Sequence, residues 1–471
     1  MCSATYLEIN EEIYDKFEKS IEEIVEKFSV GNVSVGIVRK GKTEYIHGFT
    51  NRAGRTINTN EQTLFAIGSA SKSFCALSVA LLVQDGKLSF DDKIIEYLPN
   101  FSFYDNYLTQ NATIRDCLAQ KMGLGESAGN FLFFANENSQ HEIVKKLQYL
   151  KPKYGFREKF AYQNLTFILI GELVEKVTGM PWIKFVQERI LKPLDMVNTY
   201  VTYTAYQLEN VAKPERLMED GPEEIPHRNI ENAAASGGII SCAEDMCKYL
   251  ELQLGHRSDI ISSKILHEMH KGEMVIPIED FWEIIAYDNK SFEYGMGWFR
   301  SVYKDEIVIH HGGYIDGMSA HMALLPAHDL AIIVLTNQDQ SLVPSVIWRR
   351  GVDLLLNKKG SDYEEKFLNT AKIMAKKHIP AYIPKKYNEE YKEYLGVYYS
   401  VLYDNMEIME KNDKIVVTKG RYYTGFVVEK DGDKLLVQWR DPVLGISWLT
   451  FERENQEVVT VNLPAMGYFH K

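Results

Sequence analysis

The chain has 471 residues, of which 45% are hydrophobic and 25% are charged, a mixture typical of folded globular proteins with two or three domains. Lys and Arg number 53 against 65 Asp and Glu, so the formal net charge is −12. This charge gives no attraction to nucleic-acid phosphates or to anionic lipid, and we expect neither nucleic acid nor a membrane as a partner.

The N-terminal segment predicts no secretory signal, because no apolar core follows a basic start. No apolar run approaches the ~20 residues that a bilayer-spanning helix needs. Five scattered cysteines without Cys-x-x-Cys spacing fit neither a disulfide framework nor a zinc site: Cys2, Cys75, Cys117, Cys242 and Cys247. We interpret them as reduced, buried thiols and predict a cytoplasmic protein that needs no metal or cofactor.

The first predicted elements are a helix and a pair of strands. Apolar residues recur at helical spacing over 11–29, which predicts an amphipathic helix. The runs 33–38 and 43–49 are rich in β-formers, and Gly41 between them suits a hairpin turn.

Helices and strands then alternate. A helical pattern over 71–86 ends at a glycine, and a loop followed by a buried helix is predicted over 161–178. The sequences Thr-Ile-Arg-Asp at 113–116 and Ser-Cys-Ala-Glu at 241–244 have the spacing of capping boxes, so each predicts a helix start. Two strand runs lie on either side of a Gly-rich turn within 307–336. This alternation predicts an α/β or α+β layered domain.

The composition changes after about residue 358. Residues 359–389 are polar and Lys-rich and predict a linker with one helix. Short alternating strands separated by turns follow, which predict a small antiparallel sheet or barrel. We therefore expect a first domain over 1–358, a linker over 359–389 and an accessory β domain over 390–471.

The first candidate chemical group is Ser69 with Lys72 at the start of a predicted helix, where residues three apart share one face. A serine hydroxyl needs a neighbour to accept its proton, and a lysine does so only where its pKa is lowered. Gly68 permits a close approach, and the helix start offers N–H groups to an oxyanion. In isolation, an ordinary helix cap with a solvated lysine explains the same pattern.

Tyr162-Gln163-Asn164 precedes the predicted buried helix. A tyrosine near a cationic lysine can exist partly as phenolate and relay a proton, and an Asn amide can hold a substrate carbonyl. The alternative is a polar loop in which Asn164 is the N-cap.

The third group is His310-His311-Gly312-Gly313-Tyr314. Glycines beside an edge strand let a substrate backbone lie close, and a histidine there can hydrogen-bond to the substrate. The alternative is a glycine-rich hairpin turn with incidental histidines.

Together the three groups resemble, in order and spacing, the motifs of the class C β-lactamase family and its relatives, the D-alanyl peptidases, D-aminopeptidases and carboxylesterases. Members carry Ser-x-x-Lys, Tyr-x-Asn and Lys/His-x-Gly. Segments that resemble further family landmarks lie at 65–68, 169–179, 235–245 and 294–298. The resemblance covers roughly residues 12–345 and implies an antiparallel sheet flanked by helices, and the tail resembles the lipocalin-like domain of some relatives.

The resemblance also implies roles for residues. Ser69 would attack a carbonyl, Lys72 would accept its proton, and Tyr162 would return a proton to the leaving group. Asn164 would orient the substrate amide.

The glycine-rich segment would supply the rest of the substrate site. His311 rather than His310 takes the Lys/His position, followed by Gly313. The N–H groups of Ser69 and Tyr314 would form the oxyanion hole.

Two departures from the family pattern argue against β-lactam resistance as the natural role. His311 stands in place of the lysine of true β-lactamases, and a neutral imidazole holds a carboxylate less firmly. Gln120-Lys121-Met122-Gly123-Leu124 stands where relatives have His-x-Ser-Gly-Leu.

We therefore predict a serine hydrolase that forms an acyl-enzyme on a small-molecule or peptide substrate, an ester or an amide that includes peptides with D-residues. The alternative is a catalytically idle scaffold or assembly protein with the same fold. The sequence identifies neither the natural substrate nor the oligomeric state, so it is compatible with a monomer and with an oligomer.

Overall fold

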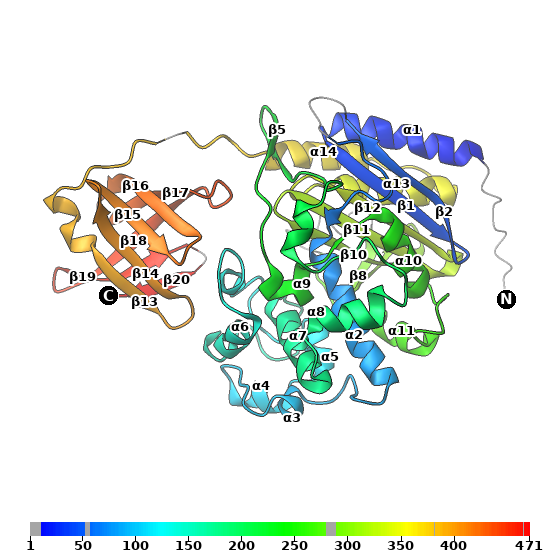
Figure 1. The fold of residues 1–471 in the computed structure, drawn as a ribbon, viewed down its shortest axis with the longest axis horizontal. Coiled ribbons are helices and arrows are strands. Elements are labelled where there is room, and N and C mark those ends of the chain that lie inside the picture. Colours follow the sequence, from blue (N-terminus) through cyan, green and yellow to red (C-terminus); the bar gives the residue numbers. More distant parts are fainter. Residues whose placement is uncertain (1–10, 52–56, 279–288, 381, 465) are drawn as a thin grey trace.

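The computed structural model describes residues 11–51, 57–278, 289–380, 382–464 and 466–471. A large layered domain and a small β-barrel lie side by side and are joined by an extended segment (Figure 1). The layered domain with a separate antiparallel β domain is the predicted fold class, and the structure confirms it.

An antiparallel sheet with strand order β2-β1-β12-β11-β10-β9-β8-β7 forms the middle layer of the large domain. Every residue of its central strands β1, β11 and β12 is buried, because helices cover both faces. The strands are β1 (Asn32–Arg39), β2 (Lys42–Thr50), β7 (Met274–Val275), β8 (Asn289–Tyr294), β9 (Phe299–Tyr303), β10 (Glu306–Ile315), β11 (Met318–Leu325) and β12 (Leu330–Thr336).

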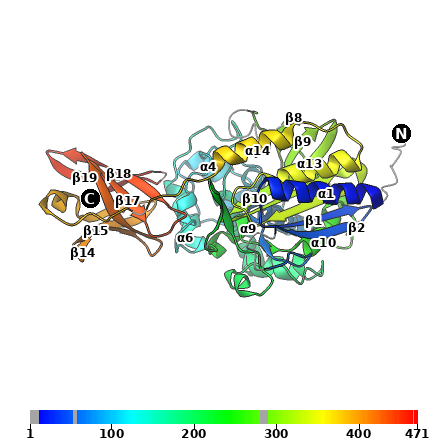
Figure 2. The same ribbon diagram turned by 90° about the horizontal axis from the view of Figure 1, so that it is seen from above.

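Three helices pack on one face of the sheet, α1 (Glu11–Lys27), α13 (Val343–Leu355) and α14 (Tyr363–Met374). Figure 2 shows them side by side. The apolar stripe of α1 includes Phe17 and Ile21, which join Trp348 and Phe367 in one buried cluster. The amphipathic helix predicted over 11–29 is confirmed.

The other described helices lie on the opposite side, where α10 packs directly on β1, β2 and β12. Among them α2 is central, since its residues are buried all around from Ser71 to Leu82. No helix in the described part of the chain is both long and apolar enough to cross a bilayer. These helices are α2 (Ser71–Gln84), α3 (Ile94–Tyr97), α4 (Asn106–Asn111), α5 (Ile114–Leu118), α6 (Gln140–Lys146), α7 (Leu165–Thr178), α8 (Trp182–Val186), α9 (Ala234–Gly237), α10 (Ala243–Gln253) and α11 (Ser263–Met269).

The large domain also contains two short two-stranded sheets, β3 (Phe65–Ala66) with β6 (Ile240–Ser241) and β4 (Glu215–Met218) with β5 (Gly221–Glu224). Four of the five cysteines are buried free thiols, as predicted, and Cys2 lies outside the described residues.

The two predicted capping boxes have different outcomes. Thr113 caps α5 and its box with Asp116 is complete, so this prediction is confirmed. The box predicted at Ser241 is wrong, because Cys242 is the N-cap of α10 and makes no side-chain cap. Ser241 is instead the last residue of β6, and its hydroxyl lies 2.8 Å from the Thr199 hydroxyl.

The Gly-rich turn predicted within 307–336 is displaced. Gly312 and Gly313 lie inside β10, which continues to Ile315, and the turn to β11 lies at Asp316 and Gly317. Cross-strand pairing with β11 over these glycines keeps the segment extended.

The C-terminal β domain is a closed antiparallel barrel, which removes all exposed sheet edges. Tyr398, Trp439 and Phe451 are buried in its core, whereas Phe426 and Trp448 are partly exposed. Its strands are β13 (Gly396–Ser400), β14 (Asp404–Lys411), β15 (Lys414–Lys419), β16 (Tyr423–Asp431), β17 (Lys434–Trp439), β18 (Ile446–Glu454), β19 (Glu457–Leu463) and β20 (Gly467–His470).

The barrel contacts the large domain at a few polar and aromatic points. Lys146 at the end of α6 lies 2.7 Å from the Asp404 carboxylate, and the rings of Phe131 and Tyr423 meet at 6.3 Å. Arg228 of the large domain pairs with Asp441 of the barrel at 2.9 Å.

The predicted linker 359–389 contains α14, whose Tyr363 and Phe367 are buried on the large domain. We propose that the connection between the domains is the shorter stretch 375–388, whose described residues form only isolated bridges, at Lys376 and Lys386. We expect limited trypsin digestion to cut first at its exposed lysines, among them Lys377 and Lys385. A chain that ends after Pro380 should still unfold cooperatively, as measured by circular dichroism. A truncated chain that fails to fold would mean that both domains share one core.

Candidate active site

Ser69 and Lys72 lie where a short 3₁₀ turn, Gly68–Ala70, continues into α2. Ala70 is the N-cap and makes no side-chain cap, and the Lys72 side chain is 0% exposed. The structure therefore excludes the alternative of an ordinary helix cap with a solvated lysine. The Lys72 Nζ atom lies 3.1 Å from the Ser69 Oγ atom.

Three segments converge on the Lys72 amine. Besides Ser69 it contacts the Asn164 Oδ1 atom at 2.6 Å and the Ser236 carbonyl oxygen at 2.8 Å. Burial lowers the pKa of Lys72 to about 7. A neutral amine can donate to the two carbonyl-type oxygens and accept from the Ser69 hydroxyl, so the geometry suits a proton acceptor for Ser69.

Tyr162 lies over the same amine, with the Lys72 Nζ atom 4.9 Å from its ring centre. Burial raises the pKa of Tyr162, while a side-chain hydrogen bond with Ser69 acts in the opposite direction. The expectation of a partial phenolate is therefore not supported, because a neutral Lys72 would give the phenolate no counter-charge. Tyr162 is placed instead as a protonated hydroxyl that can donate.

Asn164 holds the N-cap position of α7, but its side chain does not cap the helix. Its Nδ2 atom donates to the Asn130 Oδ1 atom at 3.1 Å, which fixes the amide orientation with Oδ1 toward Lys72. The alternative of a plain N-cap is therefore not observed. The role of Asn130 has no sequence signal, because it lies in a short 3₁₀ turn that is distant in sequence from the three motifs.

Gln120 positions the loop that carries Tyr162 and Asn164. Its amide accepts from the Gln163 N–H at 2.8 Å and donates to the Gln163 carbonyl at 3.0 Å. Gln120 has φ of 62°, and its side chain is 0% exposed. The sequence shows this residue only as a departure from the family pattern, and its contacts to Gln163 become visible in the structure.

β10 runs directly against the turn that holds the nucleophile. A Cβ atom added to Gly313 would lie 1.9 Å from the Ile67 carbonyl oxygen and 2.8 Å from the Ser69 nitrogen. Gly68 has φ of +50°, and a Cβ atom there would meet the Tyr314 backbone at 2.7 Å. The absence of both side chains brings the backbones of Ser69 and Tyr314 together, where the predicted oxyanion hole requires them.

His311 faces this site, whereas His310 projects to the other face of β10. The Tyr294 hydroxyl lies 3.1 Å from the His311 Nε2 atom, and the Nδ1 atom lies 2.5 Å from the Gly312 carbonyl. Burial and the Lys72 charge lower the pKa of His311 to about 3, so its ring is neutral. The sequence showed Tyr294 only as part of the segment 294–298 that resembles the family, and its contact with His311 is visible only in the structure.

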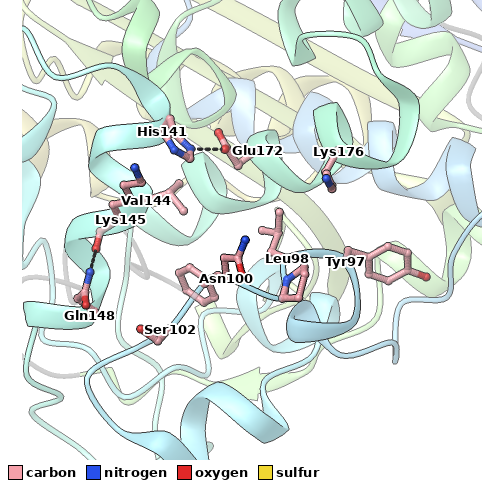
Figure 3. Close-up of a pocket in the computed structure, with 12 residues that line it drawn as sticks. Tyr97, Leu98, Asn100, Ser102, His141, Val144, Lys145, Gln148, Glu172 and Lys176 are labelled. Carbon is pink, nitrogen blue, oxygen red and sulfur yellow. Dashed lines mark hydrogen bonds and ion pairs between the residues drawn. The ribbon is translucent and has the colours of Figure 1, made fainter.

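A cavity of about 460 Å³ opens at Ser69 and is lined by Asn164, Tyr314 and Asp316 among others. Another cavity of about 540 Å³ lies between α6, α7 and residues 97–102 (Figure 3). None of the predicted catalytic residues lines the second cavity, where His141 pairs with Glu172 at 2.8 Å. The cavity at Ser69 is therefore the candidate substrate site.

Comparison with known sequences places this site in a family context. The family model described as Beta-lactamase matches residues 17–356. Protein flp of Staphylococcus aureus (strain N315) is 24% identical over 361 residues, which are 74% of this chain and 67% of that protein. Unguisins hydrolase ungD' of Aspergillus campestris (strain IBT 28561) is 26% identical over 337 residues, 69% of this chain and 62% of that protein. The matches thus span about two thirds of these relatives.

Two solved structures share the fold. The octameric penicillin-binding protein homologue from Pyrococcus abyssi has a TM-score of 0.64 and 22% identity, and covers 97% of this chain and 100% of that chain. The D-amino acid amidase from Ochrobactrum anthropi SV3, complexed with L-phenylalanine amide, has a TM-score of 0.60 and 22% identity, covering 73% and 98%. The match to the Pyrococcus abyssi protein therefore extends over both domains of this chain.

The close approach of β10 to the nucleophile turn gives a first test of the site. We expect Gly313→Ala to lower the free energy of unfolding by about 2 kcal/mol or more, because its methyl group overlaps the Ile67 carbonyl. Urea denaturation measures this change. Gly360→Ala is the matched control, since a Cβ atom there meets nothing within 4 Å. Equal stability of the two variants would contradict the packing described.

Proposed function

Since the chain belongs to the Beta-lactamase family, we propose that it is a serine hydrolase that cleaves an ester or an amide through an acyl-enzyme on Ser69. The observation that carries the proposal is the buried Lys72 amine, with a pKa of about 7, in contact with the Ser69 hydroxyl. An amine held near neutrality beside a serine is the activated pair that acyl transfer needs.

In acylation, the Ser69 Oγ atom bonds to the substrate carbonyl carbon while its proton passes to Lys72. The N–H groups of Ser69 and Tyr314 hold the oxyanion of the tetrahedral intermediate. The bond to the leaving group then breaks. Tyr162 donates its proton to the leaving group and regains one from Lys72, so the protons balance.

In deacylation, a water molecule attacks the acyl carbon and transfers a proton to the Tyr162 and Lys72 pair. The carbon–Oγ bond breaks, the proton returns to Ser69, and a carboxylic acid is released. Asn164 contributes by orienting Lys72 and by lining the cavity where the acyl part lies.

The name of one relative, a hydrolase, supports hydrolysis in general, and the name of one solved structure, a D-amino acid amidase, supports amide cleavage. We therefore extend the proposal to amides and peptides, those with D-residues included. A neutral His311 offers no charge to the carboxylate of a β-lactam, so we do not propose β-lactam resistance.

The nucleophile can be tested by covalent labelling. We expect a fluorophosphonate probe to label the wild-type chain and not Ser69→Ala, and hydrolysis of a generic ester to fall by ~10³-fold or more. Ser71→Ala is the matched control from the same motif, because the Ser71 hydroxyl is engaged with the Ile239 N–H at 3.1 Å. Labelling of the Ser69→Ala chain would show another nucleophile, and an unlabelled wild type would favour the idle scaffold.

The pH dependence follows from Lys72. The amine is active as a base when it is neutral, so the rate should be low below its pKa and rise through about 7. Between about pH 6 and pH 8 we expect kcat/KM for an ester to increase about tenfold and then level off. A rate that is constant over this range would remove Lys72 as the titrating base.

A further inference from the structure

A smaller cavity of about 200 Å³ also opens at Ser69, on the side of Tyr162. It shares Ser69, Ser127 and Tyr314 with the larger cavity. Tyr162 lines only the smaller one and Asn164 only the larger one. The nucleophile therefore lies where two adjoining cavities meet.

The smaller cavity exists because the sheet is open at this point. β9 pairs with β10 only as far as the pair Phe299 and His310, whereas β10 continues to Ile315. Side chains alternate along β10, so His310 and Gly312 face away from Ser69. Gly312 has no side chain to close the gap, and the cavity reaches His321 of β11 and Ser345 of α13.

Two histidines that line this cavity have unused hydrogen-bonding capacity. The His310 Nδ1 and His321 Nε2 atoms are buried without a hydrogen-bond partner in the described part of the chain. The two residues are 1% and 4% exposed, and their rings stack at 5.3 Å. Buried polar atoms without partners are rare in folded proteins, because they have lost water without a replacement. We call the part of the cavity that is lined by His310, Gly312, His321 and Ser345 the histidine chamber.

The charge of the histidine chamber limits what it accepts. Burial lowers the pKa of His310 and of His321 well below the ordinary value, so both rings are neutral. Each neutral ring has one donor and one acceptor nitrogen. Among the described residues that line the whole cavity, the only acid is Glu126, and there is no lysine or arginine. The charge of Arg349 also lowers the pKa of both rings, but Arg349 does not line the cavity. A carboxylate would therefore lose its hydration there without a cation of the lining to contact.

We propose that the histidine chamber binds the leaving group of the substrate, and that it selects leaving groups with a short, uncharged hydrogen-bonding end such as a carboxamide. This inference rests on the proposed function, in which Tyr162 protonates the leaving group from the same side. The leaving group passes Tyr162 and reaches the two ring nitrogens past Gly312, while the acyl part occupies the larger cavity.

Acyl transfer tests this inference directly, because an alcohol that captures the acyl group must occupy the leaving-group side. The full-length chain is supplied with p-nitrophenyl acetate and equal concentrations of glycolamide, glycolate and 2-methylpropan-1-ol. These three alcohols have similar shapes and differ in charge and hydrogen bonding. The acyl carbon exchanges its bond to the Ser69 Oγ atom for one to the alcohol oxygen, and the alcohol proton returns to Ser69.

We expect the wild type to form about tenfold more glycolamide ester than either other ester, as one or two hydrogen bonds would give. His321→Leu removes the ring nitrogens and should reduce the preference to about twofold or less. Gly312→Ala is a second variant that keeps both histidines, with its methyl group 3.2 Å from the His321 Nδ1 atom, and should act alike. His141→Leu, in the cavity of Figure 3, is the matched control and should keep the preference.

Several results would overturn the inference. They are capture of glycolate or 2-methylpropan-1-ol at least as well as glycolamide, no capture of any alcohol, and a preference that persists in both chamber variants. p-Nitrophenol release separates this failure from that of the proposed function. Release that does not depend on Ser69 overturns the proposed function, whereas Ser69-dependent release without a preference overturns the histidine chamber alone.

Discussion

The buried amine of Lys72 is the constraint around which the site is built. A lysine without exposure is stable only if it is neutral or if each of its hydrogen atoms finds an acceptor. Ser69, Asn164 and Ser236 meet this requirement from the starts of α2 and α7 and from α9. The same helices also bury the amine, and burial lowers the pKa of Lys72, so packing sets the chemistry.

The guanidinium of Arg228 connects the two domains at the edge of the substrate cavity. Arg228 is 6% exposed and pairs with Asp316, just after β10, and with Asp441 of the barrel. Its guanidinium also lies 4.3 Å from the Phe134 ring centre. Asp316 and Phe134 line the larger cavity, so the barrel carries a counter-charge for one wall of the site. Buried ion pairs of this kind fix geometry more than they stabilise a fold.

The sequence predicted the layered fold, the β domain and the three groups around Ser69, because each has a local pattern. Ser69 and Lys72 are one helical turn apart, and periodicity alone places them on one face. The contacts of Asn130 and Gln120 could not be predicted, since both depend on loops that meet only after folding. The failed capping box at Ser241 has the same origin, because pairing of β6 with β3 overrides the local preference.

The contact of Gly68 with Tyr314, and of Gly313 with Ser69, has a consequence for folding kinetics. These contacts join segments that are far apart in sequence, so they close a long loop of the large domain. The oxyanion hole cannot exist before this closure is complete. Reactivity of Ser69 toward a covalent probe therefore reports that this long-range contact has formed during folding.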